Sequence, residues 1–297
     1  MSLFASLFGP LLGRTGRPVP PAPRPAPVHA VPTGAPFPLG LTVHQLTDAA
    51  IATLAPLHVR QVRTTVYASL WAAPAGGAGT DRATMTARLG SALAAGLDVL
   101  VVVHGGPSSG WVPVIGDLAR RLPALAIQVG NECDAGAGAI APADYVALWR
   151  AVRGAVRPAT RLVTAGAGGP DSAVYARALA GAGLVPDAVA VHAYGPPPAA
   201  ALLERLAPLR GATASPIWCT EFGLAPRDIR RAWPTDDPAR DEARQAAEWQ
   251  AVAAAAPGRV ARAYGYCLDA AEGAGYGILR PDGSRRPVAA WLAARGD

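Results

Sequence analysis

The most informative segment of the sequence is Leu125-Ala126-Ile127-Gln128-Val129-Gly130-Asn131-Glu132, an apolar run that ends on an amide and a carboxylate. Short apolar runs rich in branched side chains predict buried strands. Asn131 is the only asparagine in the chain, and lysine is absent altogether. In a composition that avoids such residues, an asparagine followed by a glutamate at the end of a buried strand indicates a functional site.

Working outward from this run, strand-like and helix-like patterns alternate eight times from Leu39 onward. The predicted strands cover Leu41–His44, Val59–Tyr67, Val99–His104, Ala126–Glu132, Leu162–Ala165, Ala188–Tyr194, Ile217–Glu221 and Val260–Leu268. Helical patterns lie between them, over Asp81–Ala95, Val112–Arg121, Pro142–Val156, Ser172–Ala182, Ala199–Leu209 and Pro238–Ala255. Such alternation implies parallel strands joined by helices, and eight repeats favour a single (β/α)8 barrel of the α/β class over an open sheet.

The first 36 residues differ from everything after them. An apolar start is followed by a proline-rich segment from Pro18 to Pro38, which predicts an extended polyproline-like arm. We expect residues 1–36 to form this arm, which we interpret as a docking segment for a partner protein, and residues 37–297 to form the barrel domain.

The same segment bears on localisation. Arg14 and Arg17 follow the apolar start instead of preceding it, so a secretory signal is not convincing. The apolar stretch, about eleven residues, is too short to span a bilayer. Localisation is therefore open, and membership of a virion or another extracellular assembly is one hypothesis.

Composition excludes several classes of protein. Half of the 297 residues are hydrophobic and only 16% are charged, below the roughly 25% of ordinary domains, which predicts a large core. The net charge of +6 comes from arginines scattered along helical patterns, so we expect no nucleic-acid partner. Cys133, Cys219 and Cys267 are odd in number and lack Cys-x-x-Cys spacing, so we expect buried free thiols, no metal site and no cofactor.

Reactive residues of a barrel gather at the carboxyl ends of its strands. Polar side chains at the ends of the predicted strands are Arg63, His104, Asn131, Glu132, His192, Tyr194 and Glu221. The aromatic residues Trp71, Trp111, Trp233, Tyr266 and Tyr276 lie in or near the following loops. Aromatic faces of this kind can stack on the apolar faces of sugars.

Three motifs in order carry a family resemblance: Gly130-Asn131-Glu132, Val191-His192-Ala193-Tyr194-Gly195 and Trp218-Cys219-Thr220-Glu221-Phe222-Gly223. Over roughly residues 40 to 294, the chain resembles the clan of retaining glycoside hydrolases with (β/α)8 barrels, which includes cellulases, xylanases, β-xylosidases and β-galactosidases. The carboxyl-terminal stretch from Leu268 to Trp291 is also similar to the last strand and helix of that clan.

The resemblance implies a role for each strand-end residue. Glu132 would be the general acid/base, Glu221 the nucleophile, and Asn131 the partner of the sugar hydroxyl next to the reacting carbon. Arg63 and Tyr194 would keep Glu221 ionised, while His104 and His192 would contact substrate or orient the acid. Two carboxyl groups in these roles should lie about 5–5.5 Å apart, and a covalent glycosyl-enzyme would form at Glu221.

The chain departs from the clan at its last strand, where the clan commonly has a tryptophan beneath the sugar and this chain has Tyr266 and its neighbours. The sugar and the linkage are therefore not predicted.

The first hypothesis is a retaining O-glycosidase that acts on a β-linked glycan. The alternative is a structural or glycan-binding barrel in a larger assembly such as a phage tail, with or without residual activity. An aldolase or a phosphate-binding isomerase is disfavoured, because the chain has no lysine for a Schiff base and no phosphate-binding loop.

Overall fold

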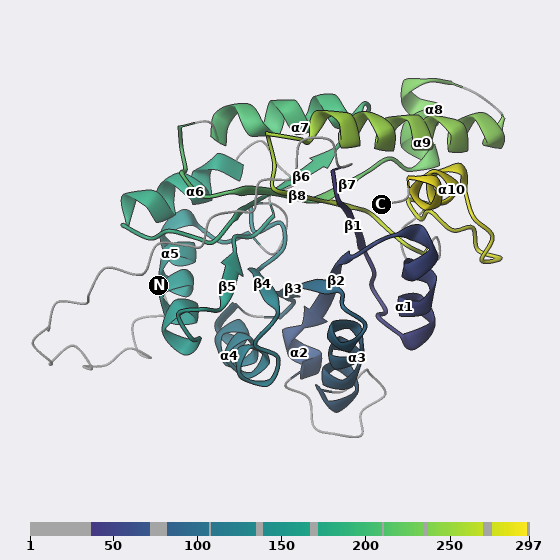
Figure 1. Ribbon diagram of the computed structural model, residues 1–297. Coiled ribbons are helices and arrows are strands. Elements are labelled where there is room, and N and C mark those ends of the chain that lie inside the picture. Colours follow the sequence, from purple (N-terminus) through teal and green to yellow (C-terminus); the bar gives the residue numbers. More distant parts are fainter. Residues whose placement is uncertain are drawn as a thin grey trace, which may run out of the picture.

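A computed structural model describes residues 37–71, 82–106, 108–134, 139–166, 172–209, 211–234, 237–269 and 275–295. Its centre is one sheet of eight parallel strands in the order β5-β4-β3-β2-β1-β8-β7-β6 (Figure 1). The strands are β1 (Leu39–Thr42), β2 (Gln61–Tyr67), β3 (Asp98–His104), β4 (Ala126–Val129), β5 (Arg161–Val163), β6 (Val189–Tyr194), β7 (Ile217–Gly223) and β8 (Arg262–Gly265). The predicted (β/α)8 barrel is confirmed. The arm predicted for residues 1–36 lies outside the described residues.

The sheet closes between its two ends, β5 and β6. A single parallel bridge joins Val163 to Ala188 there, and the Thr164 amide donates to the Ala188 carbonyl at 3.1 Å. Closure places the carboxyl ends of all eight strands around one mouth, so residues far apart in the sequence can form one site.

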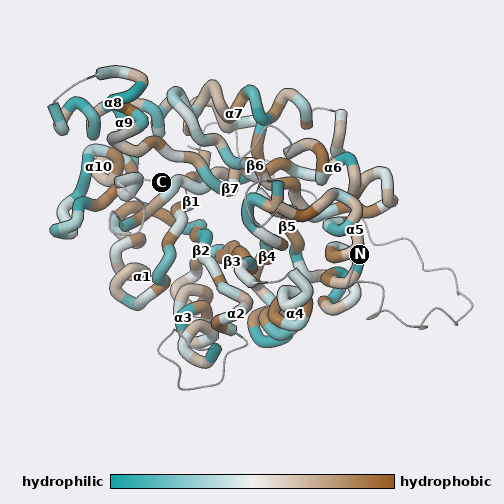
Figure 2. Tube along the Cα trace, turned by 180° about the vertical axis from the view of Figure 1, so that it is seen from behind, coloured by the Kyte–Doolittle hydropathy of each residue, from teal (hydrophilic) through white to brown (hydrophobic). Residues whose placement is uncertain are grey.

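Helices surround the strands (Figure 1). They are α1 (Asp48–Leu54), α2 (Ala68–Trp71), α3 (Arg82–Ala94), α4 (Trp111–Arg121), α5 (Pro142–Ala155), α6 (Ser172–Gly181), α7 (Pro198–Leu206), α8 (Pro226–Ala232), α9 (Pro238–Ala255) and α10 (Pro287–Ala294), with 3-10 turns at Ala55–Leu57, Ser108–Gly110 and Ala207–Leu209. In Figure 2 the inner strands β3 and β4 are strongly hydrophobic, whereas the helices mix hydrophilic and hydrophobic residues. Two-sided helices of this kind bury one face against the sheet.

The helix patterns read from the sequence match α3 to α7 and α9 to within a few residues at either end. Two prolines, Pro142 and Pro238, open α5 and α9 as predicted, at a position where the missing N–H costs no bond. The short helices α1, α2 and α8 are not predicted. Across the described residues, no helix is both long enough and apolar enough to cross a bilayer.

A separate apolar cluster fills the half of the barrel interior that lies away from the mouth, toward the amino ends of the strands, which we call the bottom. It is made of Leu100, Ala126, Val163, Ala188, Ala190, Trp218 and Tyr264. Beneath it, Asp98 at the start of β3 pairs with Arg161 of β5 at 3.2 Å and with Arg262 of β8 at 2.5 Å. The guanidinium of Arg262 also lies 4.4 Å from the ring centre of Trp218. The bottom of the barrel is therefore packed and cross-linked by charge, and only the opposite mouth is left for a site.

The three cysteines are buried and free, as expected. Burial raises the pKa of the Cys133 thiol to about 12 and also raises that of Cys219. Thiols that stay protonated are poor nucleophiles, so Cys133 and Cys219 serve as packing residues.

Candidate active site

Glu221 lies on β7 and points into the barrel because the strand pairing shifts just before it. Val191 pairs with Cys219, but the next residue of β6, His192, pairs with Glu221, so Thr220 is left over as a bulge. Successive strand residues point to opposite sides, and a bulge of one residue reverses the side for those that follow. The irregularity therefore turns the Glu221 carboxylate toward the same interior as His192.

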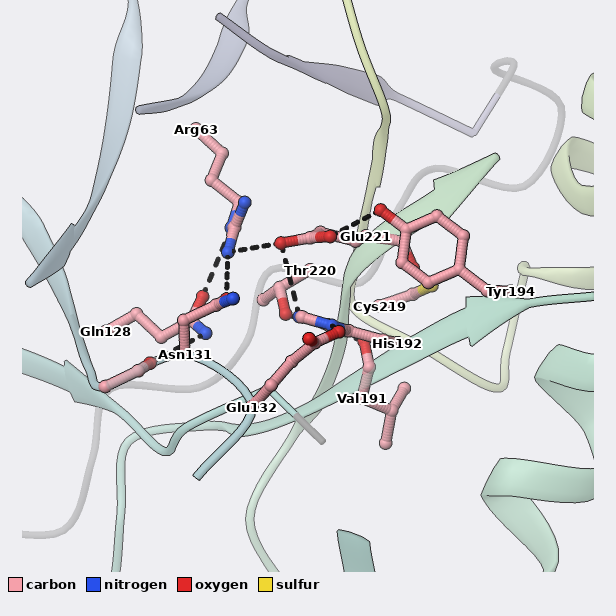
Figure 3. A network of polar contacts seen from close by, with 11 residues as sticks. Arg63, Gln128, Asn131, Glu132, Val191, His192, Tyr194, Cys219, Thr220 and Glu221 are labelled. Carbon is pink, nitrogen blue, oxygen red and sulfur yellow. Dashed lines mark hydrogen bonds and ion pairs between the residues drawn. The ribbon is translucent and has the colours of Figure 1, made fainter. Parts of the chain in front are cut away.

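The Glu221 carboxylate is surrounded by donors (Figure 3). Arg63 of β2 lies 2.7 Å from Oε1 through its Nη2, and the Tyr194 hydroxyl donates a short hydrogen bond to Oε2. The Arg63 and Glu221 side chains are only 2% and 8% exposed. A buried carboxylate with one donor on each oxygen is held in a single orientation.

Two opposing effects act on the ionisation of Glu221. Burial on its own would raise the pKa of the carboxyl, but the positive charge of Arg63, together with His192 and the Tyr194 hydrogen bond, more than offsets it and holds the pKa below the usual value. Tyr194 itself has a raised pKa, chiefly through burial, so its phenol stays protonated and donates. Glu221 is therefore an anion at neutral pH and is available as a nucleophile.

Glu132 lies just beyond β4, in an unusual backbone conformation. Gly130 and Glu132 have φ values of +88° and +44°, and the left-handed region is costly for a residue with a side chain. The Glu132 amide donates to the Gly166 carbonyl at 2.8 Å, which fixes the turn. Strain at a residue other than glycine is concentrated at functional sites, so this conformation marks Glu132 independently of its sequence motif.

His192 lies between the two carboxylates. Its Nδ1 is 3.0 Å from Glu132 Oε1, and its Nε2 is 3.6 Å from Glu221 Oε1. The Glu132 side chain is 42% exposed and the imidazole is fully buried. Glu132 thus reaches into the open mouth while its inner oxygen is held by a fixed ring. Glu132 is therefore much more exposed than Glu221, whose side chain is 8% exposed.

The ring of His192 fits only because residue 166 is a glycine. A Cβ built on Gly166 would lie 2.0 Å from His192 Nε2. The same residue accepts the Glu132 amide through its carbonyl and bridges to Asn131. Gly166 therefore positions both Glu132 and its histidine partner. No motif in the sequence indicates this role.

Asn131 is tied to the nucleophile through Arg63. The Arg63 guanidinium donates to Asn131 Oδ1 at 2.8 Å from Nη2 and to Gln128 Oε1 at 3.3 Å from Nε. Gln128 in turn donates to the Gly130 carbonyl at 3.2 Å. One arginine thus links the residues before Glu132 to Glu221, so the two carboxylates share a single rigid network.

Ligand oxygens of the two carboxylates, together with a nitrogen of His192, all lie within 4.8 Å of one another. Carboxyl groups whose nearest oxygens are this close fit the retaining geometry of about 5–5.5 Å better than the inverting geometry of about 6.5–9.5 Å. The same three residues could present ligands to a metal ion. However, the Arg63 cation already pairs with Glu221, and a positive charge at that place disfavours a second cation.

His104 and Tyr266 also lie at the mouth. His104 packs against Tyr67 with ring centres 4.9 Å apart, and burial and the nearby Arg63 charge lower the pKa of the imidazole. Tyr266 contacts His44, Tyr194 and Tyr276 edge-on, at 5.1, 6.2 and 5.6 Å between ring centres. Tyr67 is absent from the residues predicted to form the site, although it ends β2 as the others end their strands.

Three tryptophans were predicted to stack on the sugar, and most of their surface is covered by other parts of the protein. Trp71 is buried and donates to Asp117 of α4 at 3.2 Å. Trp111 is buried beneath the turn that carries Glu132, where a Cβ on Gly130 would lie 2.8 Å from its ring. These two residues are only 6% and 5% exposed, so they offer little surface to a sugar. Trp233 is partly exposed and is covered on one face by Arg244, with 3.9 Å to the ring centre.

No protein-family model matches the sequence, and no curated protein is similar to it in sequence. Solved structures do match. A family 39 glycoside hydrolase from Bacteroides cellulosilyticus has a TM-score of 0.65 at 15% identity, over 88% of this chain and 63% of that one. A family 39 β-xylosidase from Caulobacter crescentus has a TM-score of 0.63 at 18% identity, over 87% of this chain and 71% of that one.

A broad-specificity endoglucanase of family 5 from Clostridium acetobutylicum has a TM-score of 0.62 at 15% identity, and here the match covers 87% of this chain and 96% of that one. At such identities the likeness shows a shared barrel fold. This chain spans less than two thirds of the length of the Bacteroides protein.

Proposed function

We propose that this protein is a retaining glycosidase that hydrolyses a β-linked glycan by double displacement, with Glu132 as acid/base and Glu221 as nucleophile. The observation that carries the proposal is the pair of carboxylates with ligand oxygens within 4.8 Å, one ionised and enclosed by donors and the other reaching into the mouth. The three structural neighbours support it, since each is described as a glycoside hydrolase, a β-xylosidase or an endoglucanase.

In the first step Glu132 donates its proton to the leaving-group oxygen while Glu221 attacks the anomeric carbon, which yields a glycosyl ester on Glu221. In the second step Glu132, now ionised, removes a proton from water, and that water displaces Glu221 and regenerates both carboxyl groups. The environments fit these roles. The half-exposed Glu132 can reach the leaving group and water, whereas the enclosed Glu221 meets only the sugar.

The other supporting residues fit into the same cycle. Arg63 and Tyr194 aim the attacking oxygen and stabilise the carboxylate when it leaves. His192 holds Glu132 Oε1, so the other oxygen of Glu132 is free to carry the proton. A barrel that only binds glycan has no need of a strained glutamate held next to an ionised one, which is why we favour hydrolysis over a purely structural role.

The test is hydrolysis of 4-nitrophenyl β-glycosides and β-linked oligosaccharides, with the configuration of the first-formed product read by proton NMR. We expect β product from β substrate. Glu132→Gln and Glu221→Gln should each lower kcat by at least about 100-fold, in the range for loss of a general acid or nucleophile. Glu204→Gln, an exposed glutamate of α7, is the matched control. An α first product, or unchanged activity in both variants, contradicts the proposal.

A further inference from the structure

The turn that carries Glu132 lies where two strands of the barrel stop pairing regularly. The register of β4 with β5 ends at Gln128 and Val163, and the two chain segments meet again only at the bridge between Asn131 and Gly166. Glu132 follows this bridge directly, with its φ of +44°. A strained conformation persists only where its surroundings over-determine it, so the contacts around this interruption decide where Glu132 lies.

Tyr145 of α5 connects the two segments at the interruption. Its hydroxyl accepts the Ala165 amide at 2.7 Å and donates to the Val129 carbonyl at 2.9 Å. Ala165 precedes Gly166, whose carbonyl accepts the Glu132 amide at 2.8 Å. Burial raises the pKa of the Tyr145 phenol, so the hydroxyl keeps the proton that it donates. One hydroxyl thus fixes the chain just before the turn and also fixes the segment against which the turn rests.

Tyr175 of α6 holds the other side of the turn. Its hydroxyl makes a short contact with the Cys133 carbonyl and lies 2.7 Å from the Ile140 carbonyl, and it can donate its one proton to either. The Cys133 carbonyl also accepts the Ile140 amide at 2.8 Å. Cys133 follows Glu132 directly, so Tyr175 fixes the chain where it leaves the turn.

The two tyrosines lie in a tightly packed place outside the barrel. The helices α5 and α6 pack against each other (Figure 1), and the centres of the two rings are 4.7 Å apart. Tyr145 and Tyr175 are only 0% and 4% exposed. Close packing leaves their rings little room to follow a movement of the turn. Any buried tyrosine hydroxyl needs a partner, but each of these two finds a carbonyl within three residues of Glu132.

We propose that Tyr145 and Tyr175 are positioning residues for the acid/base, and that their hydroxyl groups clamp the Glu132 turn from outside the barrel. The inference rests on the proposed function, which gives Glu132 its catalytic role. Both tyrosines are buried, so they act through the backbone on either side of Glu132 and not on the substrate. The position of a catalytic group matters because a misplacement of 1 Å can cost about 100-fold in rate.

The expected effect depends on the leaving group of the substrate. A phenyl β-glycoside needs the proton of Glu132 in the first step, whereas a 2,4-dinitrophenyl β-glycoside has a leaving group that departs without one. Tyr145→Phe removes one oxygen and keeps the ring. It should lower kcat/KM by about 10-fold or more for the phenyl glycoside and by less than about 2-fold for the dinitrophenyl glycoside. Tyr175→Phe should act in the same direction, whereas a merely structural role would leave the ratio of the two values unchanged.

The matched control is Tyr264→Phe. Tyr264 is also fully buried, and its hydroxyl accepts a hydrogen bond from Arg262 at 3.3 Å at the bottom of the barrel. The change removes the same oxygen far from the Glu132 turn, so the ratio should stay that of the wild type. The substrates are glucosides and xylosides, and the ratio is measured on the sugar that the wild type hydrolyses faster.

A second readout needs no activity. Hydrogen exchange followed by mass spectrometry reports how firmly residues 126–134 are held. This segment should exchange faster in Tyr145→Phe and in Tyr175→Phe than in the wild type or in Tyr264→Phe, because the Glu132 amide loses part of its support. Exchange in the strands at the bottom of the barrel should stay the same, which separates a loosened turn from a general loss of stability.

An unchanged ratio of kcat/KM values in both variants, or unchanged exchange of residues 126–134 in both, overturns the clamp. The two proposals fail separately. Hydrolysis with the same ratio in every variant sinks the clamp and leaves the proposed catalysis intact. A wild type that hydrolyses none of the glycosides sinks the proposed catalysis, and the exchange of residues 126–134 then decides whether the two hydroxyl groups hold the turn.

Discussion

At the scale of single residues, Arg63 controls the charge of the nucleophile. Burial opposes ionisation of Glu221, and Arg63 is the strongest group acting against it. Replacing Arg63 with Met keeps most of the volume and removes the charge, so the pKa of Glu221 must rise. A nucleophile is active above its pKa, so the acidic limb of the kcat/KM profile should move to higher pH in Arg63→Met.

The same change should lower the free energy of unfolding at neutral pH by about 3–5 kcal/mol, because it leaves a buried carboxylate without its partner. Because the folded-state pKa of Glu221 is depressed, this stability is present above the unfolded-state pKa and is lost as the pH falls through the folded-state pKa. Chemical denaturation at pH 7 and in acid checks both points. Arg150→Met, at an exposed position on α5, is the control, and an acidic limb that stays in place would contradict the role of Arg63.

Gly166 gives a second prediction at this scale. Gly166→Ala should displace His192, since the new Cβ would lie 2.0 Å from Nε2. We expect a loss of about 1–3 kcal/mol in the free energy of unfolding, the usual cost of overpacking, together with a loss of kcat. His192→Ala removes the clash, so Gly166→Ala should cost much less in that background. A double-mutant cycle measures this, and additive effects of the two changes would refute the steric link.

The residues of the site were largely predictable, but their geometry was not. The residues Arg63, Asn131, Glu132, His192, Tyr194 and Glu221 were predicted because each lies at the end of a predicted strand. The structure brings all of them together. The bulge at Thr220 and the space at Gly166 depend on contacts between strands, which a single sequence does not contain. The burial of Trp71 and Trp111 was likewise not predictable, because residue type alone does not tell whether a ring near a strand end is exposed.

At the scale of elements, the alternation of strand and helix was a strong signal, and the ends of the elements were a weak one. β4 ends at Val129, three residues before its predicted end, because Gly130 turns into the left-handed region. The helix α1 was missed because its seven residues are too few to show a helical period; it depends on the Thr47 side chain, which accepts the Ala50 amide. Tertiary contacts and caps set such boundaries.

The space around two glycines, Gly265 and Gly154, predicts opposite effects of alanine on stability. A Cβ on Gly265 of β8 would lie 1.8 Å from the ring of Trp249 on α9, so the helix packs directly on the strand backbone. Gly265→Ala should lower the free energy of unfolding by about 1–3 kcal/mol, because Trp249 is fully buried and has no room to move. By contrast, nothing lies within 4 Å of a Cβ on Gly154 of α5, and Gly154→Ala should raise stability by about 0.5–1 kcal/mol. Thermal or urea unfolding of the two variants compares them, and effects of the same sign would refute this packing argument.

At the scale of the whole molecule, stability and chemistry lie at opposite ends of the barrel. Asp98 ties β3 to Arg161 and Arg262 at the bottom. Burial raises the pKa of Asp98, but the two arginines outweigh burial and the net pKa is lowered. Asp98→Asn should therefore lower the free energy of unfolding at pH 7 by about 1–2 kcal/mol. This is less than the roughly 1.5–3 kcal/mol of buried hydrogen bonds to a charged group, because the Asp98 side chain is 33% exposed and solvent screens the pairs.

The depressed pKa fixes the pH dependence of this effect. The stabilisation by Asp98 is present above its unfolded-state pKa and is lost as the pH falls through its folded-state pKa, so wild type and Asp98→Asn should converge in acid. Because Asp98 is distant from the mouth, kcat should be unchanged at pH 7. A lower kcat in Asp98→Asn at pH 7 would show that the two ends are not independent.

If Glu221 is the nucleophile, it forms a covalent bond to the sugar, and the most direct test is to trap that bond. The protein is incubated with 2,4-dinitrophenyl 2-deoxy-2-fluoro-β-glycosides of glucose and xylose, reagents that slow the second step more than the first. Its intact mass is then measured by mass spectrometry, and a digest locates the modified peptide. We expect a gain of one fluorosugar on the peptide that contains Glu221, and no gain in Glu221→Gln. An adduct on Glu132, or hydrolysis of the reagent with no adduct on any carboxylate, would contradict the assignment of Glu221 as nucleophile.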